Sequence, residues 1–385
     1  MSRPIIVILM CAFAWNTALT AATVQMVDPP TVDLKAADSL SAVVDSLGDD
    51  RVVYVGEVHT AYADHLVQLA VLRRLHDRDP KLAIGVEWFQ QPYQEHLDAY
   101  IRGEIGEGEM LARTEYFSRW SFDYRLYRPI LRFARDHGIP VVALNAPAEL
   151  TRAVGELGRA DVPEELLHHL PSAYGPVGAD YQERLREVFD AHPERADNGG
   201  FERFVEVQLT WDESMAERVA AYLASHPVRR MVVFAGRGHI GHGSGIPSRV
   251  ARRSGIEGRI VLVAHGDGED REAADFLVLA SPRELPEAGL MGVILDTDDE
   301  EGVRVKALSP AGAAAGAGVE KDDILVAIDG RPVPSYADVK LALLDKAPGE
   351  RIRLSVRRSG LITDREEILE LELKGRGAMG MAHHP

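Results

Sequence analysis

The sequence contains a single cysteine, Cys11, among its 385 residues. One cysteine cannot close a disulfide within a chain, so the fold must rest on its apolar core. Basic side chains are also fewer than acidic ones: the chain has 43 lysines and arginines and 60 aspartates and glutamates, which gives a formal net charge of −17. Binding to nucleic-acid phosphates requires a basic surface, so nucleic acid is not expected as a partner.

The longest N-terminal apolar run, from Pro4 to Trp15, is well short of the roughly 20 residues that cross a bilayer. It follows Arg3 and precedes small residues that end at Ala22. This order predicts a secretory signal peptide over residues 1–22 and an exported protein, periplasmic or associated with the envelope. Cleavage there would remove Cys11, and a lipid anchor on that cysteine is the less favoured alternative.

Between residues 35 and 268, short apolar runs alternate with longer stretches that carry apolar residues at helical spacing. Nearly continuous apolar runs are typical of strands that are buried on both faces of a parallel sheet. The runs begin at residues 51, 81, 139, 229 and 259. The sequence therefore predicts an α/β fold, a parallel-sheet sandwich, with additional helices between residues 147 and 226 that cap the sheet.

Polar side chains follow four of these runs. Glu57 and His59 come after the first, Glu87 and Asn145 end the next two, and His239 follows the fourth. The carboxyl ends of parallel strands meet at one edge, where open α/β sheets bind ligands. Carboxylates and imidazoles suit Zn, Mn, Fe or Co, and they equally suit proton transfer by a histidine that a carboxylate orients.

Other candidates have competing structural interpretations. His65 either supports the pocket or only begins the helix after the first strand, and His242 lies in a glycine-rich loop that can carry an incidental histidine. Tyr124 and Arg128 are one helical turn apart, so they share a face that is expected to line the pocket. Asp212 is expected to belong to a helix that packs against the sheet.

The chain from about residue 40 to 265 resembles the ChaN-like haem-binding domain of the Tiki superfamily. Two G-x-x-H elements and three motifs between them carry the resemblance, because their order and spacing along the chain match those of the family. The elements are GEVH at 56–59 and GRGH at 236–239, and the motifs are GVEWF at 85–89, WSFDYRLYRPILRFARDHGIPVVALNAP from 120, and QLTWDESMA from 208. The joint pattern is far more specific than a single G-x-x-H.

This resemblance implies haem or iron binding, since the family is associated with bacterial haem or iron uptake. More distant relatives include Tiki-type metalloproteases, the TraB group and erythromycin esterases. By matching motifs, the functional positions fall on Glu57, His59, Glu87 and His239, with Tyr124 and Arg128 in the helix between them. A haem requires an axial ligand, an apolar slot and cations for its propionates; the candidates for these roles are Tyr62, Tyr116, Trp120, Tyr124, Tyr127 and Arg128.

Residues 283–375 resemble a small α+β PDZ domain of the type found in bacterial proteases, and residues 376–385 are expected to form a flexible tail. The resemblance implies that an extended peptide adds to a sheet edge and that backbone amides hold its terminal carboxylate. Met291, Gly292 and Val293 fall where the carboxylate-binding loop belongs. The chain departs from the family pattern at Asp322, where a glycine usually stands.

Three functions follow as alternatives. The first is an exported haem- or iron-binding protein whose PDZ domain docks peptide C-termini or an envelope partner. The second is a Tiki-like metal-dependent hydrolase that uses Glu57, His59, Glu87 and His239 with a divalent metal such as Mn, Zn or Co. The third is an adaptor with a degenerate pocket. A homodimer is possible in each case.

Overall fold

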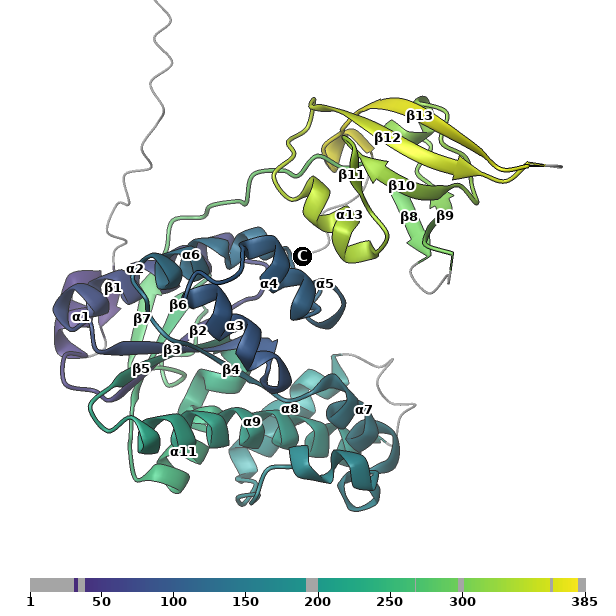
Figure 1. Cartoon of the computed structure of the whole chain (residues 1–385). Coiled ribbons are helices and arrows are strands. Elements are labelled where there is room, and N and C mark those ends of the chain that lie inside the picture. Colours follow the sequence, from purple (N-terminus) through teal and green to yellow (C-terminus); the bar gives the residue numbers. More distant parts are fainter. Residues whose placement is uncertain are drawn as a thin grey trace, which may run out of the picture.

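The computed structural model describes residues 31–33, 39–191, 200–266, 268–296, 301–360 and 363–379. The expected signal peptide lies outside the described residues, as does most of the expected tail, of which Gly377–Met379 form a 3-10 turn. Figure 1 shows two bodies that an extended segment connects, a large α/β domain and a smaller C-terminal domain. No helix in the described part of the chain is long and apolar enough to cross a membrane.

A seven-stranded sheet forms the centre of the large domain (Figure 1). Its order is β1-β7-β6-β2-β5-β3-β4; β2 to β7 run parallel, and the short β1 pairs antiparallel with β7. The strands are β1 (Thr31–Asp33), β2 (Val52–Glu57), β3 (Leu82–Gln90), β4 (Val141–Asn145), β5 (Arg230–Gly236), β6 (Arg259–Ala264) and β7 (Phe276–Leu279). The five predicted strands are confirmed as β2 to β6, whereas β1 and β7 were not predicted.

Helices cover both faces of the sheet. One face packs against α1 (Leu40–Ser46), α2 (Tyr62–Arg78), α3 (Gln94–Ile101), α4 (Glu107–Arg113), α5 (Tyr116–Arg119) and α6 (Arg128–Asp136). The other face packs against α9 (Gly200–Ser225), α10 (Arg237–Ile240) and α11 (Ile246–Ser254), and α7 (Ala148–Leu157) and α8 (Ala179–Asp190) lie against α9. The two-sided cover is why the strands are apolar on both faces.

Strand β2 illustrates how the sequence sets this architecture. Val53 and Val55 point into the core on the α2 side, and Val52 and Tyr54 point into the core on the α9 side. Successive side chains of a strand alternate between faces, so all four are buried. Burial of each such side chain stabilises the fold by about 1.5–3 kcal/mol. The register of β2 between β5 and β6 then fixes where Glu57 ends the strand.

The C-terminal domain contains an antiparallel sheet in the order β13-β12-β10-β9-β8, with β11 paired to β10. Its strands are β8 (Val293–Asp296), β9 (Val303–Leu308), β10 (Ile324–Ile328), β11 (Arg331–Pro332), β12 (Arg351–Arg358) and β13 (Arg365–Glu372), and its helices are α12 (Ala313–Gly316) and α13 (Tyr336–Leu343). Asp322 adopts φ +70°, the backbone region that glycine favours, so the usual turn forms here despite the substitution.

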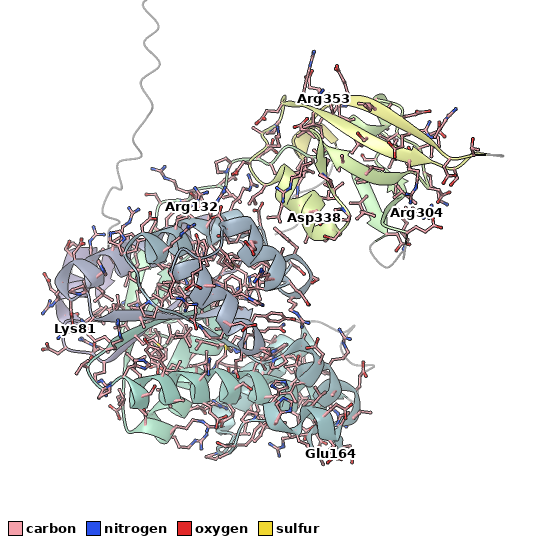
Figure 2. All side chains as sticks on the ribbon, viewed as in Figure 1. Lys81, Arg132, Glu164, Arg304, Asp338 and Arg353 are labelled. Carbon is pink, nitrogen blue, oxygen red and sulfur yellow. The ribbon has the colours of Figure 1, made fainter. Side chains whose placement is uncertain are left out.

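Helix α13 joins the two domains, because it packs against α4 and α5 of the large domain. Leu341 and Leu344 extend the large domain's core. Arg128 reinforces the contact through ion pairs with Glu107, on its own domain, and with Asp345. Elsewhere charged side chains such as those of Lys81, Glu164 and Arg353 lie on the outside of the molecule (Figure 2).

Candidate functional site

The two G-x-x-H elements and Glu87 come together at the carboxyl edge of the parallel sheet. Glu57 and Gly236 end the neighbouring strands β2 and β5 and face each other in register. Glu87 lies in β3, the other neighbour of β5, and its Oε2 accepts a hydrogen bond from the Gly236 amide at 2.7 Å. His59 follows β2 directly, and His239 lies in α10, which begins after β5.

Glu57 anchors the ring of His59. The Glu57 carboxylate is buried, and its Oε1 lies 2.7 Å from Nδ1 of His59. Trp120 contacts the ring edge-on, with 4.9 Å between centroids, and Phe122 lies at 4.8 Å. Within the described part of the chain Nε2 of His59 has no hydrogen-bond partner, and the side chain is 28% exposed. The imidazole therefore has one fixed nitrogen and one available nitrogen.

Gly236 provides the space that His59 occupies. A Cβ atom at this position would lie 2.8 Å from Cε1 of His59 and 3.6 Å from Oε2 of Glu87. Both distances show how closely the strand end approaches the two side chains. The glycine of the second G-x-x-H element thus leaves room for the histidine ring of the first.

A second histidine–carboxylate pair lies beside the first. Nδ1 of His239 is 2.6 Å from Oδ1 of Asp212, and its Nε2 is 3.5 Å from Oε1 of Glu87. Asp212 is fully buried in α9, where the Tyr181 hydroxyl donates to its other oxygen at 2.6 Å. Asp212 was expected only to help pack a helix, and nothing in the local sequence indicated that it would meet His239.

Three carboxylates determine the electrostatics of the site. Burial lowers the pKa of His239, but the charges of Glu87 and Asp212 outweigh it and raise that pKa to about 9. The pKa of His59 is also raised: burial opposes the cation, and the hydrogen bond to Glu57 with the charge of Glu87 more than offsets this. The charge of His239 lowers the pKa of His59 less than the carboxylates raise it.

The raised pKa of His239 predicts a pH-dependent stability. Protonation of His239 stabilises the fold fully below pH 6.5, its unfolded pKa, and this contribution is lost as pH rises towards 9. A shift of this size corresponds to about 3 kcal/mol at most. Urea unfolding at pH 6 and pH 9.5 should show wild type losing more stability than His239→Asn between these values. Equal losses in both proteins would contradict the assignment.

His65 and His242, both predicted supporting residues, lie at the margins. His65 is buried behind the site, where its ring nitrogens face the Gln68 side chain at 3.0 Å and the His59 carbonyl at 3.1 Å. It positions the loop that carries His59. The amide of His242 donates to the Ala273 carbonyl, and Nε2 of its ring lies 3.6 Å from a carboxylate oxygen of Asp270.

The structure places Tyr124 and Arg128 away from His59, although both were expected to line its pocket. The Tyr124 hydroxyl donates to Glu107 at 3.0 Å, and Arg128 binds the same carboxylate. Their common face turns towards the C-terminal domain rather than the sheet edge. Tyr127 instead approaches the site, since its buried hydroxyl donates to the His59 carbonyl at 3.3 Å.

Bare metal binding finds no support in the arrangement of these side chains. Among the residues that the structure describes, no group of three or more His, Cys, Asp or Glu side chains is placed to hold a metal ion. Nδ1 of each histidine faces a carboxylate, so Nε2 is the ring nitrogen left for a ligand.

The predicted carboxylate loop of the C-terminal domain precedes its edge strand. Gly292 has φ +78°, a conformation that glycine adopts without strain. The carbonyls of Met291 and Gly292 accept from Ala314 and Ser309, at 2.8 and 2.9 Å. In the described part of the chain, the amides of Met291 and Gly292 donate no hydrogen bond. Val293 begins β8 next to them.

Comparison with known proteins accounts for both domains. The haem-binding uptake family (Tiki superfamily, ChaN) matches residues 43–250, more than half of the chain. This chain belongs to the ChaN family. Its ChaN domain is followed by a PDZ domain that matches at residues 289–373. Both predicted resemblances are confirmed.

Three individual proteins illustrate these relationships. A structure of cofacial haem binding to ChaN of Campylobacter jejuni has a TM-score of 0.54 at 16% identity, and the match covers 66% of this chain and 97% of that one. The chloroplastic protein RETICULATA-RELATED 5 of Arabidopsis thaliana is 24% identical over 263 residues, 63% of this chain but only 35% of the plant protein. The HtrA3 PDZ domain bound to a phage-derived ligand matches 23% of this chain and 90% of its own, at 21% identity and a TM-score of 0.20.

Proposed function

We propose that the ChaN domain binds haem with His59 as an axial ligand. The observation that carries this proposal is the state of the His59 ring: Glu57 holds Nδ1, and Nε2 is available and partly exposed. Histidines that ligate a metal almost always donate their other ring N–H to a carboxylate, a carbonyl or water, which fixes the tautomer. The ring therefore fits a haem iron, which takes a single imidazole nitrogen on one side.

The surroundings of His59 are consistent with a flat apolar ligand. Trp120 and Phe122 both place aromatic surface against the imidazole and contact each other, with 5.4 Å between their centroids. Such a surface suits the apolar face of a porphyrin. The buried charge of Glu57, whose Oε2 has no partner among the described residues, makes the imidazole a stronger donor. When bound, haem would supply an iron that this family carries for uptake.

The N-terminal sequence and the PDZ domain complete the proposal. The signal-like segment supports export to the periplasm or envelope, and the free amides of Met291 and Gly292 support capture of a peptide C-terminus. The PDZ domain would then dock the haem-binding domain to an envelope partner.

A haem titration of the purified mature protein tests this function. We expect a saturable Soret shift in the wild type and at least a tenfold weaker affinity in His59→Ala, because an axial ligand is lost. His226→Ala is the matched control, since His226 lies at the end of α9 and is exposed. Equal affinity in all three proteins would refute His59 as the ligand, and a missing Soret shift in the wild type would refute haem binding.

A second candidate, hydrolysis by acid–base catalysis, rests on His239. The Asp212 pair and the raised pKa keep His239 protonated at neutral pH, with Glu87 3.5 Å away. This arrangement suits a general acid beside a carboxylate base. Turnover of nitrophenyl esters that survives a chelator but is lost in His239→Asn would support it. Activity that His239→Asn leaves intact would exclude it.

A further inference from the structure

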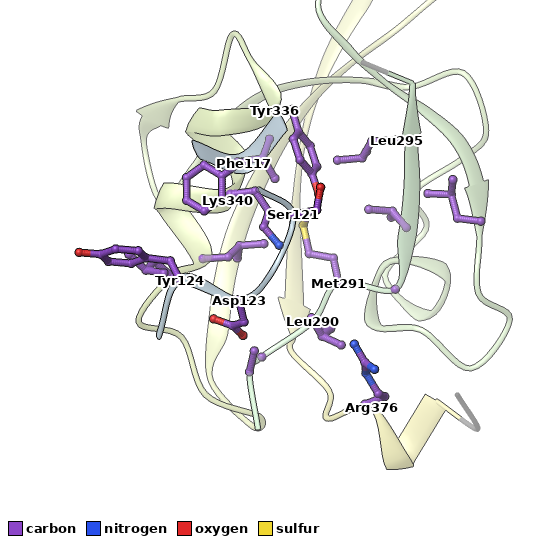
Figure 3. A pocket seen from close by; sticks show the side chains of 18 of the residues that line it. Phe117, Ser121, Asp123, Tyr124, Leu290, Met291, Leu295, Tyr336, Lys340 and Arg376 are labelled. Carbon is purple, nitrogen blue, oxygen red and sulfur yellow. The ribbon is translucent and has the colours of Figure 1, made fainter. Parts of the chain in front are cut away.

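A cavity of about 510 Å³ lies between the PDZ domain and the ChaN domain. One side is formed by the carboxylate loop, β8 and α13 of the PDZ domain. The other side is formed by residues 121–125 of the ChaN domain, the segment between α5 and α6. Figure 3 shows Ser121 and Asp123 from this segment beside the same cavity as Met291 and Lys340.

The PDZ side of the cavity has the features of a peptide groove. Among the residues that the structure describes, strand β8 is the edge of its sheet and pairs with β9 alone, so its outer edge can accept a further strand. The unpaired amides of Met291 and Gly292 stand at one end, and apolar side chains such as Val339 and Leu343 line the floor. This is the chemistry of an extended peptide with a free carboxylate and an apolar last residue.

Two cations add a preference for acidic peptides. Lys340 and Arg376 both line the cavity, and neither forms an ion pair within the described part of the chain. Asp123, the nearby acid, is bound to Arg125 at 2.6 Å. Burial raises the pKa of Asp123, but the hydrogen bond to Arg125 outweighs this and the charge of Lys340 adds to the lowering. The ammonium group of Lys340 also lies 5.9 Å from the centre of the Tyr336 ring, on the cavity side. A glutamate close to the peptide terminus would therefore find an available positive charge.

Phe122 connects this groove to the haem-binding site. Its ring lies 4.8 Å from the ring of His59, and the same residue lines the cavity. Its carbonyl is held by the Tyr116 hydroxyl at 3.2 Å. The preceding Ser121 has φ +68°, a conformation that costs a non-glycine residue about 1–3 kcal/mol. A residue with a strained backbone thus adjoins an aromatic residue that contacts both His59 and the cavity.

We propose that an acidic peptide C-terminus binds between the two domains, against residues 121–125 as well as the PDZ groove, and that its binding moves Trp120 and Phe122 at the His59 site. The proposal rests on peptide binding by the PDZ domain. Because one segment forms a wall of both sites, occupation of either site changes the affinity of the other by the same factor.

The first test measures peptide affinity with the full mature chain. The probe is a fluorescein-labelled, tryptophan-free decapeptide that ends in Glu-Glu-Val with a free carboxylate. Ser121→Trp fills the cavity from the ChaN side and should weaken binding at least tenfold. Ser118→Trp is the matched control, because Ser118 is exposed on α5 outside the cavity. Equal affinity of both variants and wild type would overturn the composite groove.

The peptide's own chemistry provides two further controls. Replacing Glu-Glu by Lys-Lys should weaken binding several-fold, and Lys340→Ala should remove most of that difference while Lys306→Ala, on the exposed surface of β9, should not. If the wild type binds no carboxylate peptide better than its amidated form, peptide binding itself is wrong. If it does and Ser121→Trp has no effect, only the present inference is wrong.

The second test follows Trp120 during a titration with the unlabelled peptide. Tryptophan emission of the full chain should change on binding, and the change should vanish in Trp120→Phe but persist in Trp211→Phe. Trp211 lies near His239 on the other side of the sheet, so it is the matched reporter. Binding without any Trp120-dependent change would overturn the coupling between the two sites.

Discussion

Glu213→Ala should destabilise the ChaN domain by about 3–5 kcal/mol, the usual cost of removing one partner from a buried ion pair. The Glu213 carboxylate is fully buried in α9 and binds Arg252 at 2.6 Å and Arg253 at 2.7 Å. It also accepts from the Gly175 amide at 2.7 Å, and Arg249 lies 3.4 Å away. Without the carboxylate, the charge of Arg249 would remain buried.

Tryptophan fluorescence is the suitable probe for this loss. Trp88, Trp120 and Trp211 lie in the ChaN domain, and the PDZ domain contains no tryptophan, so urea unfolding reports on one domain alone. Glu202→Ala, an exposed change in the same helix, should alter the free energy of unfolding by less than about 0.5 kcal/mol. A loss below about 1 kcal/mol in Glu213→Ala would show that the arginine cluster is not the source of stability inferred here.

Gly236→Ala should abolish or strongly weaken haem binding, at least tenfold, while the fold survives. The new Cβ would meet the ring of His59 at 2.8 Å, and the ring is the element that can move. Alanine tolerates the backbone at this position, where φ is −55° and ψ is 141°. The change therefore displaces the proposed haem ligand without imposing backbone strain.

Gly238→Ala is the matched control for this experiment. A Cβ atom at Gly238 would have no neighbouring atom within 4 Å, and the residue belongs to the same short helix as His239. The haem affinities of the two variants, measured by Soret titration, should differ at least tenfold. Their free energies of unfolding should lie within about 1 kcal/mol of each other. Equal haem affinity would mean that the position of the His59 ring is unimportant for binding.

Local patterns explain what could be predicted. Apolar runs such as that of β2 predicted a sheet buried on both faces, and the polar residues after those runs predicted an edge where Glu57, His59, Glu87 and His239 converge. Strand β7 was not predicted, because an acidic stretch precedes it and its four residues are too few to show a periodic pattern. The three-residue strand β1 was not predicted because it is also too short.

Such patterns could not predict hydrogen bonds and ion pairs between residues that lie far apart in the sequence. Asp212 is 27 residues from His239, and Glu213 is 39 residues from Arg252, so no spacing rule relates them. Both acids are buried on one helix, where a sequence pattern predicts solvent exposure for charged residues. Helical periodicity predicted that Tyr124 and Arg128 share a face. It could not predict which neighbouring element that face would contact.

Short sequence patterns predicted the α/β fold, the glycine–histidine loops at the strand ends and the PDZ domain, because each depends on residues close together in the chain. Long-range packing places both histidines against carboxylates, and it brings Phe122 into contact with both His59 and the cavity between the domains. These contacts depend on how helices and domains pack against one another. Packing of that kind is set by the whole surface of each element and has no signature in any short segment.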